Sequence, residues 1–158
     1  MIFGQVFKHI QKQKFSAKTL SNSPLFSISN AKNAPHIILY TASTPNGHKA
    51  SITLEELGID YEYKNIDFSI NEQKEPWFLK INPNGRIPAL VDRSNENFAV
   101  FESGSMMLYL VNKYDPNHRL SFPYGTDLYW QMVSWLFFQN AGVGPMQGQA
   151  NHFYRYAP

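Results

Sequence analysis

Residues 82–103 constrain the fold of this 158-residue chain more than any other segment. They begin with Asn-Pro-Asn-Gly, which is typical of a tight turn because proline presets φ and Asn-Gly tolerates positive φ. Pro88 follows where a strand should begin. Since proline donates no hydrogen bond to a ladder, Pro88 is either an edge residue or a cis residue in a tight turn. The apolar runs 89–91 and 98–101 then predict a β-hairpin.

Glu102 and Ser103 end this hairpin, and an apolar helical pattern covers residues 105–114. A carboxylate and a hydroxyl therefore lie at a predicted helix N-terminus, where free N–H groups favour anions. Taken alone, Ser103 is more simply explained as a helix cap.

The sequence Arg-Ile-Pro-Ala-Leu, followed by a hairpin and Glu-Ser-Gly, resembles the glutathione-binding half of the glutathione transferases. That half is a thioredoxin-like domain. The resemblance implies that the backbone N–H and C=O of Ile87, just before Pro88, bind the cysteine of glutathione by a short strand addition. It also implies that Glu102 and Ser103 receive the γ-glutamyl amine and carboxylate. Arg86 either helps to hold a glutathione carboxylate or only solvates the turn.

The residues before this segment predict a β-α-β unit. Residues 36–41 are a continuous apolar run, typical of a buried strand. A helix with apolar residues along 50–57 follows, and residues 60–67 alternate as a second strand, parallel to the first. Residues 71–80 predict a short helix or an irregular segment. The whole order is β-α-β, α, β-β-α, an α/β fold of the thioredoxin-like type.

Residues 42–47 are expected to form a loop at the C-terminal edge of the sheet, where open α/β sheets bind ligands. The helix N-terminus at this point stabilises an anion. A thiol with a pKa of about 8.5 becomes more reactive when its thiolate is favoured. The Asn46 amide and the Thr44 hydroxyl can donate to a thiolate. Both are also ordinary helix caps.

A closer resemblance covers residues 35–158. The chain is similar to the fungal nitrogen-regulator-like glutathione transferases and to bacterial disulfide-bond reductases, in the segments 44–47, 82–90, 102–104, 110–114, 135–139 and 144–153. This resemblance implies that Asn46 contacts the glutathione sulfur and that no catalytic cysteine or tyrosine is used. The chain contains no cysteine, which excludes disulfides, cysteine zinc sites and Cys-X-X-Cys chemistry. Any thiol must therefore come with the substrate.

The resemblance implies an enzyme that uses bound glutathione thiolate for conjugation to a small electrophile or for reduction of disulfides or peroxides. It implies no metal, and a homodimer for full-length members. The alternative is a non-catalytic regulatory or partner-binding module, since a shared fold does not imply a shared function. The intact Asn46 motif favours the enzyme.

Residues 1–34 predict a leader outside the fold, disordered or a transit peptide. They contain five lysines and no acidic residue, with apolar residues along one side of a predicted helix. This composition fits a mitochondrial transit peptide or an extension without an address, so cytoplasmic and mitochondrial locations both stay open. Residues 35–158 carry nine basic and twelve acidic residues, a formal charge of −3 that does not indicate nucleic-acid binding. No apolar run approaches the roughly 18–20 residues that span a membrane.

The domain organisation expected beyond the leader has three parts. They are a thioredoxin-like glutathione-binding domain at 35–115, a linker at 116–123 and the start of an all-α domain at 124–158. Residues 128–138 predict a helix that is apolar over most of its circumference and would leave Trp130, Trp135, Leu136 and Phe137 exposed. The glycines and proline at 142–146 are expected to end it before another helix at 147–156. The sequence thus predicts a truncated chain with an incomplete site for the second substrate.

Overall fold

The computed structural model of the chain describes residues 35–157, and the predictions for the leader at 1–34 lie outside these residues. Its strands are β1 (Ile37–Thr41), β2 (Tyr61–Asn65), β3 (Ala89–Asp92) and β4 (Phe98–Phe101). Its α-helices are α2 (Pro45–Leu57), α3 (Pro76–Leu79), α4 (Ser103–Tyr114), α5 (Asp127–Phe137) and α6 (Gly144–Asn151). Short 3-10 turns lie at η1 (Phe68–Ile70), η2 (Glu72–Lys74) and η3 (Arg93–Asn95), and π-helical segments at η4 (Phe138–Val143) and η5 (His152–Tyr156).

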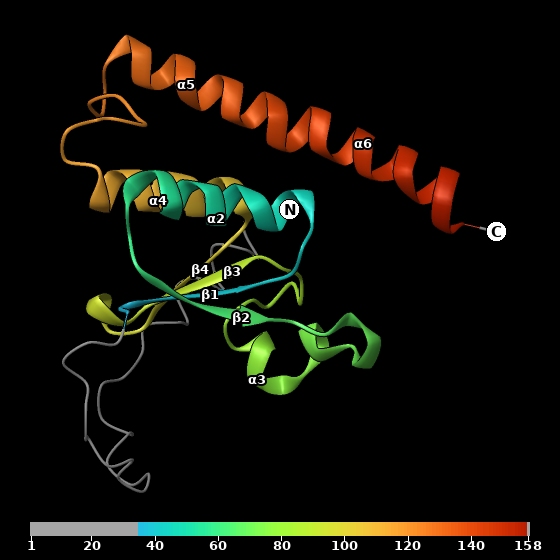
Figure 1. Cartoon of the computed structure of the whole chain (residues 1–158). Coiled ribbons are helices and arrows are strands. Elements are labelled where there is room, and N and C mark those ends of the chain that lie inside the picture. The colour runs from blue at the N-terminus through green and yellow to red at the C-terminus, as the bar shows by residue number, and fades with distance from the viewer. Residues whose placement is uncertain (1–34, 158) are drawn as a thin grey trace, which may run out of the picture. The chain divides into compact units, whose positions relative to one another are not determined.

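The four strands form one mixed sheet in the order β2-β1-β3-β4 (Figure 1). β1 runs parallel to β2, with Leu39 opposite Tyr63, as expected for a β-α-β unit. β3 runs antiparallel to β1 and to β4, with Leu90 opposite Leu39 on one side and Val100 on the other. The predicted hairpin and the predicted thioredoxin-like order are therefore confirmed.

The main core lies between the sheet and the helices α2 and α4, which run side by side over one face (Figure 1). Its buried side chains are Ile37, Leu39, Leu90 and Val100 from the strands and Ala50, Leu54, Met106 and Leu110 from the helices. A smaller cluster of Ile66, Phe78 and Ala89 packs on the other face, where α3 lies. Both faces of β1 are therefore covered, which explains its continuous apolar sequence.

The prediction that residues 142–146 end the C-terminal helix is wrong. Helical backbone continues from Asp127 to Tyr156 through α5, η4, α6 and η5 (Figure 1). In η4 the N–H of Gly144 donates to the carbonyl of Gln139, five residues earlier, and Pro145 follows in the first turn of α6. Proline has no N–H and its ring crowds the carbonyl four residues before it. The wider π turn gives this proline room, so the helix passes it without ending.

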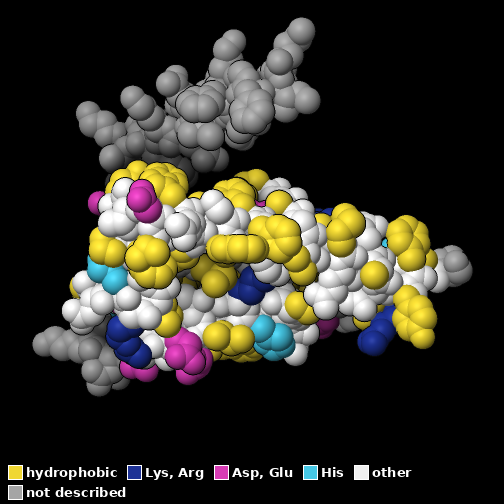
Figure 2. Space-filling view, turned by 90° about the horizontal axis from the view of Figure 1, so that it is seen from above, with side chains coloured by type: hydrophobic (Ala, Val, Ile, Leu, Met, Phe, Trp, Pro, Cys, Tyr) yellow, Lys and Arg dark blue, Asp and Glu magenta, His cyan; other side chains and the backbone are white. Residues whose placement is uncertain are grey.

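Hydrophobic side chains are exposed on the face of the molecule shown in Figure 2. On α5 the exposed fractions are 51% for Trp130, 69% for Trp135 and 61% for Phe137, while Leu136 is half-buried. The described part of the chain contains no helix long and apolar enough to span a membrane.

Candidate functional site

The turn at residues 82–86 is held by the side chain of one buried asparagine. Asn82 Oδ1 accepts the N–H of Asn84 at 3.0 Å, and its Nδ2 donates to the carbonyl of Arg86 at 2.5 Å. The N–H of Gly85 donates to the Asn82 carbonyl at 2.8 Å, and the φ of Gly85 is +61°, which suits glycine. These bonds hold the backbone in place just before Ile87.

Ile87 leads into β3 through a cis peptide bond to Pro88, which confirms the cis alternative of the sequence prediction. The ladder between β1 and β3 ends at the pair Tyr40 and Ala89, so Ile87 lies past its end. Within residues 35–157 neither the N–H nor the C=O of Ile87 has a hydrogen-bond partner. Both groups are thus available to an extended peptide.

The start of α4 differs from the cap expected for Ser103. The N-cap residue is Glu102, whose φ of +72° lies in the left-handed region and whose carbonyl accepts the N–H of Met106. Ser103 is therefore the first residue of the helix. Its buried hydroxyl donates to Asn140 Oδ1 at 3.2 Å instead of capping the backbone.

Helix α2 begins at Pro45, earlier than the predicted loop at 42–47 allows. Thr44 is its N-cap, and its hydroxyl oxygen accepts the N–H of Gly47 at 3.1 Å. Proline at the first helical position needs no N–H partner, which explains the early start. Asn46 consequently lies exposed in the first turn of α2, and its Oδ1 accepts a hydrogen bond from Lys49 at 3.1 Å.

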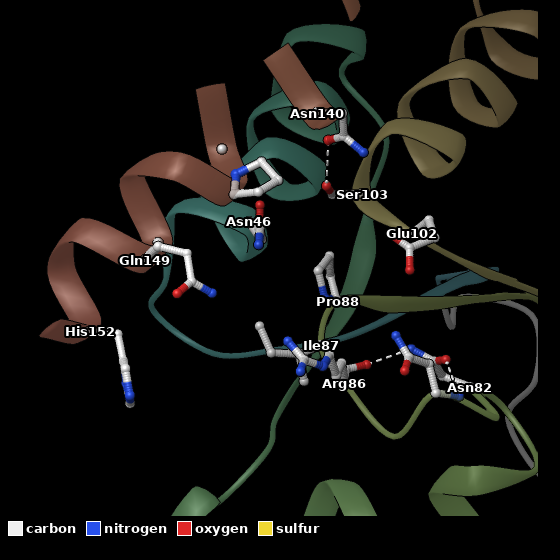
Figure 3. Close-up of a pocket in the computed structure, with 14 residues that line it drawn as sticks. Asn46, Asn82, Arg86, Ile87, Pro88, Glu102, Ser103, Asn140, Gln149 and His152 are labelled. Carbon is white, nitrogen blue, oxygen red and sulfur yellow. Dashed lines mark hydrogen bonds between the residues drawn. The ribbon is translucent and has the colours of Figure 1, made fainter. Parts of the chain in front are cut away.

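These elements surround one cavity of about 660 Å³ (Figure 3). The sequence-predicted residues that line it are Asn46, Arg86, Ile87, Pro88, Glu102 and Ser103. Thr44, which the sequence also nominated, does not line the cavity. The structure therefore brings together residues from three separate segments of the chain and leaves Thr44 as a helix cap.

Several residues at this site had no role in the sequence prediction. Asn140 from η4, Gln149 from α6 and His152 from η5 line the side of the cavity opposite Arg86 (Figure 3). Lys49 Nζ lies 2.9 Å from Asn140 Oδ1. Its spacing of three residues from Asn46 on a helix is a signal that sequence reasoning could have used. Asn140 offered no such signal, because it is distant in sequence from all the residues that it contacts.

The electrostatics of the cavity favour an anionic ligand. The first turns of α2 and α4, with Asn46 and Ser103, both face it, and helix N-termini stabilise negative charge. Partial burial lowers the pKa of Lys49, and the neighbouring Glu102 carboxylate opposes this shift. Residues 35–157 contain no group of three or more His, Asp or Glu side chains placed to hold a metal ion. The polar side-chain groups that line the cavity are thus amides, one hydroxyl, one imidazole, one carboxylate and one guanidinium.

The mixed sheet and the cis-proline before β3 define a thioredoxin-like domain, and two helix N-termini face its polar cavity. A family model for the glutathione S-transferase N-terminal domain matches residues 35–112. Through this domain the chain belongs to the glutathione S-transferase family.

Relatives with established names agree with this assignment. Glutathione S-transferase-like protein tpcF of Aspergillus fumigatus is 44% identical over 120 residues, which are 76% of this chain and 52% of that protein. Transcriptional regulator URE2 of Saccharomyces cerevisiae is 44% identical over 113 residues, 70% of this chain and 32% of that protein. The chain thus spans between about a third and a half of these relatives.

A solved structure extends the agreement to three dimensions. The glutathione transferase URE2P8 of Phanerochaete chrysosporium, determined with oxidized glutathione, is 39% identical and superposes with a TM-score of 0.77. The match covers 80% of this chain and 58% of that one.

Proposed function

We propose that this protein binds glutathione in the cavity and uses its thiolate, either for conjugation to a small electrophile or for reduction of a disulfide or peroxide. The observation that carries this proposal is the convergence of six sequence-predicted residues on one cavity. One of them is Ile87, whose backbone N–H and C=O have no hydrogen-bond partner within residues 35–157. The oxidized glutathione in the Phanerochaete chrysosporium relative supports the choice of ligand.

In this proposal each charged or hydrogen-bonding group of glutathione lies beside a protein group that can bind it. The cysteine backbone pairs with the N–H and C=O of Ile87 as a short added strand. The γ-glutamyl amine approaches the Glu102 carboxylate. The γ-glutamyl carboxylate accepts from the N-terminus of α4 and from the Ser103 hydroxyl, whose single proton turns from Asn140 Oδ1 to the ligand. Arg86, which lies exposed on the cavity wall, is available to the carboxylate at the other end of the tripeptide.

The thiol then faces the first turn of α2. The Asn46 amide donates to the sulfur without accepting its proton, so it favours the thiolate and leaves the proton to solvent. In conjugation the thiolate forms a carbon–sulfur bond as the leaving group departs with its electron pair. In disulfide reduction the thiolate attacks one sulfur and displaces the other as a thiolate. A second glutathione then releases the first sulfur and leaves oxidized glutathione.

The binding step is tested by calorimetric titration of glutathione into the full chain and two serine variants. Ser103→Ala removes a hydrogen bond to a charged group, which contributes about 1.5–3 kcal/mol, so affinity should fall roughly ten- to hundredfold. Ser105→Ala, on the exposed side of the same helix, is the matched control and should bind as the wild type does. A folded chain that takes up no glutathione at millimolar concentration would refute the proposal. Equal affinities of the two variants would refute the assigned role of Ser103.

A second candidate function is a regulatory module that binds glutathione or a partner protein without turnover. The relation to a protein described as a transcriptional regulator favours this candidate. The two functions are separated by assaying conjugation and disulfide reduction under conditions in which calorimetry shows the site to be saturated. Turnover that is lost in Asn46→Ala supports the enzyme, whereas saturation without turnover supports the module.

A further inference from the structure

Lys49 makes three contacts that join separate parts of the cavity wall. Its Nζ lies 3.1 Å from Asn46 Oδ1, 2.9 Å from Asn140 Oδ1 and 3.4 Å from Ser103 Oγ. A lysine ammonium has three N–H donors and no acceptor. The three oxygens therefore use every donor that Lys49 has, which holds the ammonium in one place.

The contact with Asn46 decides which way its amide faces. An exposed asparagine side chain has a broad preference about its last torsion angle, so its oxygen and nitrogen can exchange places. Lys49 can only donate, so it holds the oxygen of Asn46 towards itself and turns the NH₂ group away. Figure 3 shows the Asn46 nitrogen on the side of the amide that faces Ile87 and Pro88. This is the side on which the thiol lies in the proposed function.

The other two contacts extend the chain of hydrogen bonds to the opposite end of the site. Lys49 donates to Ser103 Oγ, and Ser103 in turn donates to Asn140 Oδ1 at 3.2 Å. Gly104 lets Asn140 come this close, because a Cβ on residue 104 would lie 3.1 Å from Asn140 Nδ2. One ammonium thus connects α2, α4 and the π-helical segment η4.

We infer that Lys49 is a positioning residue that turns the Asn46 amide towards the glutathione sulfur and holds the Ser103 hydroxyl beside the γ-glutamyl carboxylate. This inference rests on the proposed function. It assigns a role to a residue that lies behind the cavity wall and touches the ligand only through its neighbours. The half-buried ammonium also places a positive charge beside an anionic ligand, where solvent screens it less than at the open surface.

The test compares three variants of the full chain. Lys49→Met removes the ammonium and keeps the length of the stem, and Lys49→Arg keeps a charge and an N–H donor. Lys80→Met is the matched control, because the Lys80 side chain is exposed and makes no hydrogen bond or ion pair with the described residues. Lys49→Leu, which also removes every N–H donor of the side chain, replaces Lys49→Met if that variant fails to fold.

The first readout needs no ligand. The NH₂ resonances of Asn46 are identified by their disappearance in Asn46→Ala, and ¹⁵N relaxation reports whether the amide is ordered. We expect an ordered amide in the wild type, Lys80→Met and Lys49→Arg, and a mobile one in Lys49→Met. An amide that stays ordered in Lys49→Met overturns the inference, whether or not glutathione binds.

The second readout is the pKa of the bound thiol, followed by thiolate absorbance as the pH is raised. Loss of an oriented donor and a nearby charge should raise this pKa by about one unit in Lys49→Met, with most of the shift absent in Lys49→Arg. An unchanged thiol pKa in Lys49→Met overturns the inference while leaving the proposed function intact. A wild-type chain that binds no glutathione overturns the proposed function, and the ligand-free readout then still decides whether Lys49 orients Asn46.

Discussion

Asp92, at the end of β3, should be a main determinant of stability in this domain. Its side chain is completely buried. Oδ2 accepts from the hydroxyls of Tyr109 at 2.6 Å and Tyr114 at 2.5 Å and from Lys113 Nζ at 2.9 Å. Oδ1 accepts from the N–H and the hydroxyl of Ser94 at 2.9 and 2.7 Å. The carboxylate thus accepts five hydrogen bonds, and the three from Tyr109, Lys113 and Tyr114 join the sheet to α4.

The substitution Asp92→Asn keeps the shape of this side chain and replaces one acceptor oxygen with a donor. The two tyrosine hydroxyls can rotate to accept from the new amide, but Lys113 can only donate, so it loses its ion pair with residue 92 and keeps only the Tyr109 hydroxyl as an acceptor. Because a hydrogen bond to a charged group contributes roughly 1.5–3 kcal/mol, we expect Asp92→Asn to lower the free energy of unfolding by about that amount.

Asp67→Asn is the matched control for this substitution. Asp67 accepts from the N–H and hydroxyl of Ser69, two residues on, in the same local arrangement as Asp92 and Ser94. Asp67 is exposed and no other element donates to it within residues 35–157, so its substitution should change stability little. The free energy of unfolding is measured by urea denaturation of the full chain, followed by circular dichroism.

The cost of Asp92→Asn should also depend on pH. Burial raises the pKa of Asp92, but the hydrogen bonds from Tyr109, Tyr114, Ser94 and Lys113 outweigh burial and hold the pKa well below its usual range. Because the pKa of Asp92 is lower in the folded state than in the unfolded state, the ionised carboxylate stabilises the folded protein at pH values above the unfolded pKa of about 3.9. This stabilisation is lost as the pH falls towards the folded pKa. The difference in free energy of unfolding between wild type and Asp92→Asn should therefore be largest near neutral pH and become smaller below about pH 4. This reasoning would be refuted if Asp92→Asn lowered the free energy of unfolding no more than Asp67→Asn does, or if its effect did not change with pH.

Two further predictions concern the start of α2. Gly47→Ala should destabilise the domain and weaken glutathione binding, because its Cβ would lie 2.3 Å from the Ala42 carbonyl oxygen. Gly142→Ala, where a Cβ meets nothing within 4 Å, should be neutral or stabilising in the same thermal unfolding and titration measurements. Thr44→Ala should cost about 1 kcal/mol of stability through the lost cap and leave glutathione affinity within about twofold of wild type. A large loss of affinity in Thr44→Ala that Thr44→Ser restores would instead show that this hydroxyl contacts the ligand.

The sequence by itself was sufficient to predict the strands of the domain and the turn before Ile87. The continuous apolar run at β1, the alternation at β2 and the two short runs of the hairpin each agree with the observed strands. The tight turn before Ile87 follows from residue types that restrict the backbone locally, and the cis bond to Pro88 is one of the two alternatives that the sequence allowed. These features are predictable because the pattern of apolar residues and the backbone preferences of proline, asparagine and glycine are local properties of the sequence, even though the strands pair with distant segments.

The π turns of the C-terminal helix could not be predicted from the sequence pattern. Two glycines and a proline within residues 142–146 usually end a helix, and only the hydrogen bond from Gly144 to Gln139 shows how this one continues. The assignment of Glu102, with its positive φ, as the cap of α4 likewise required the backbone geometry.

Only the tertiary structure decided which polar groups meet at the site. Asn140 reaches Ser103 and Lys49 across 37 and 91 residues of chain, and Asp92 finds three of its donors on α4. A residue's type determines which hydrogen bonds it can make, whereas the packing of α2, α4 and η4 determines which partner lies within hydrogen-bond distance of it. The sequence therefore determined the strands, the turn and the residues suited to glutathione. The tertiary structure selected Lys49 and Asn140 and made Thr44 a cap, because contacts between distant segments exist only once those segments have packed.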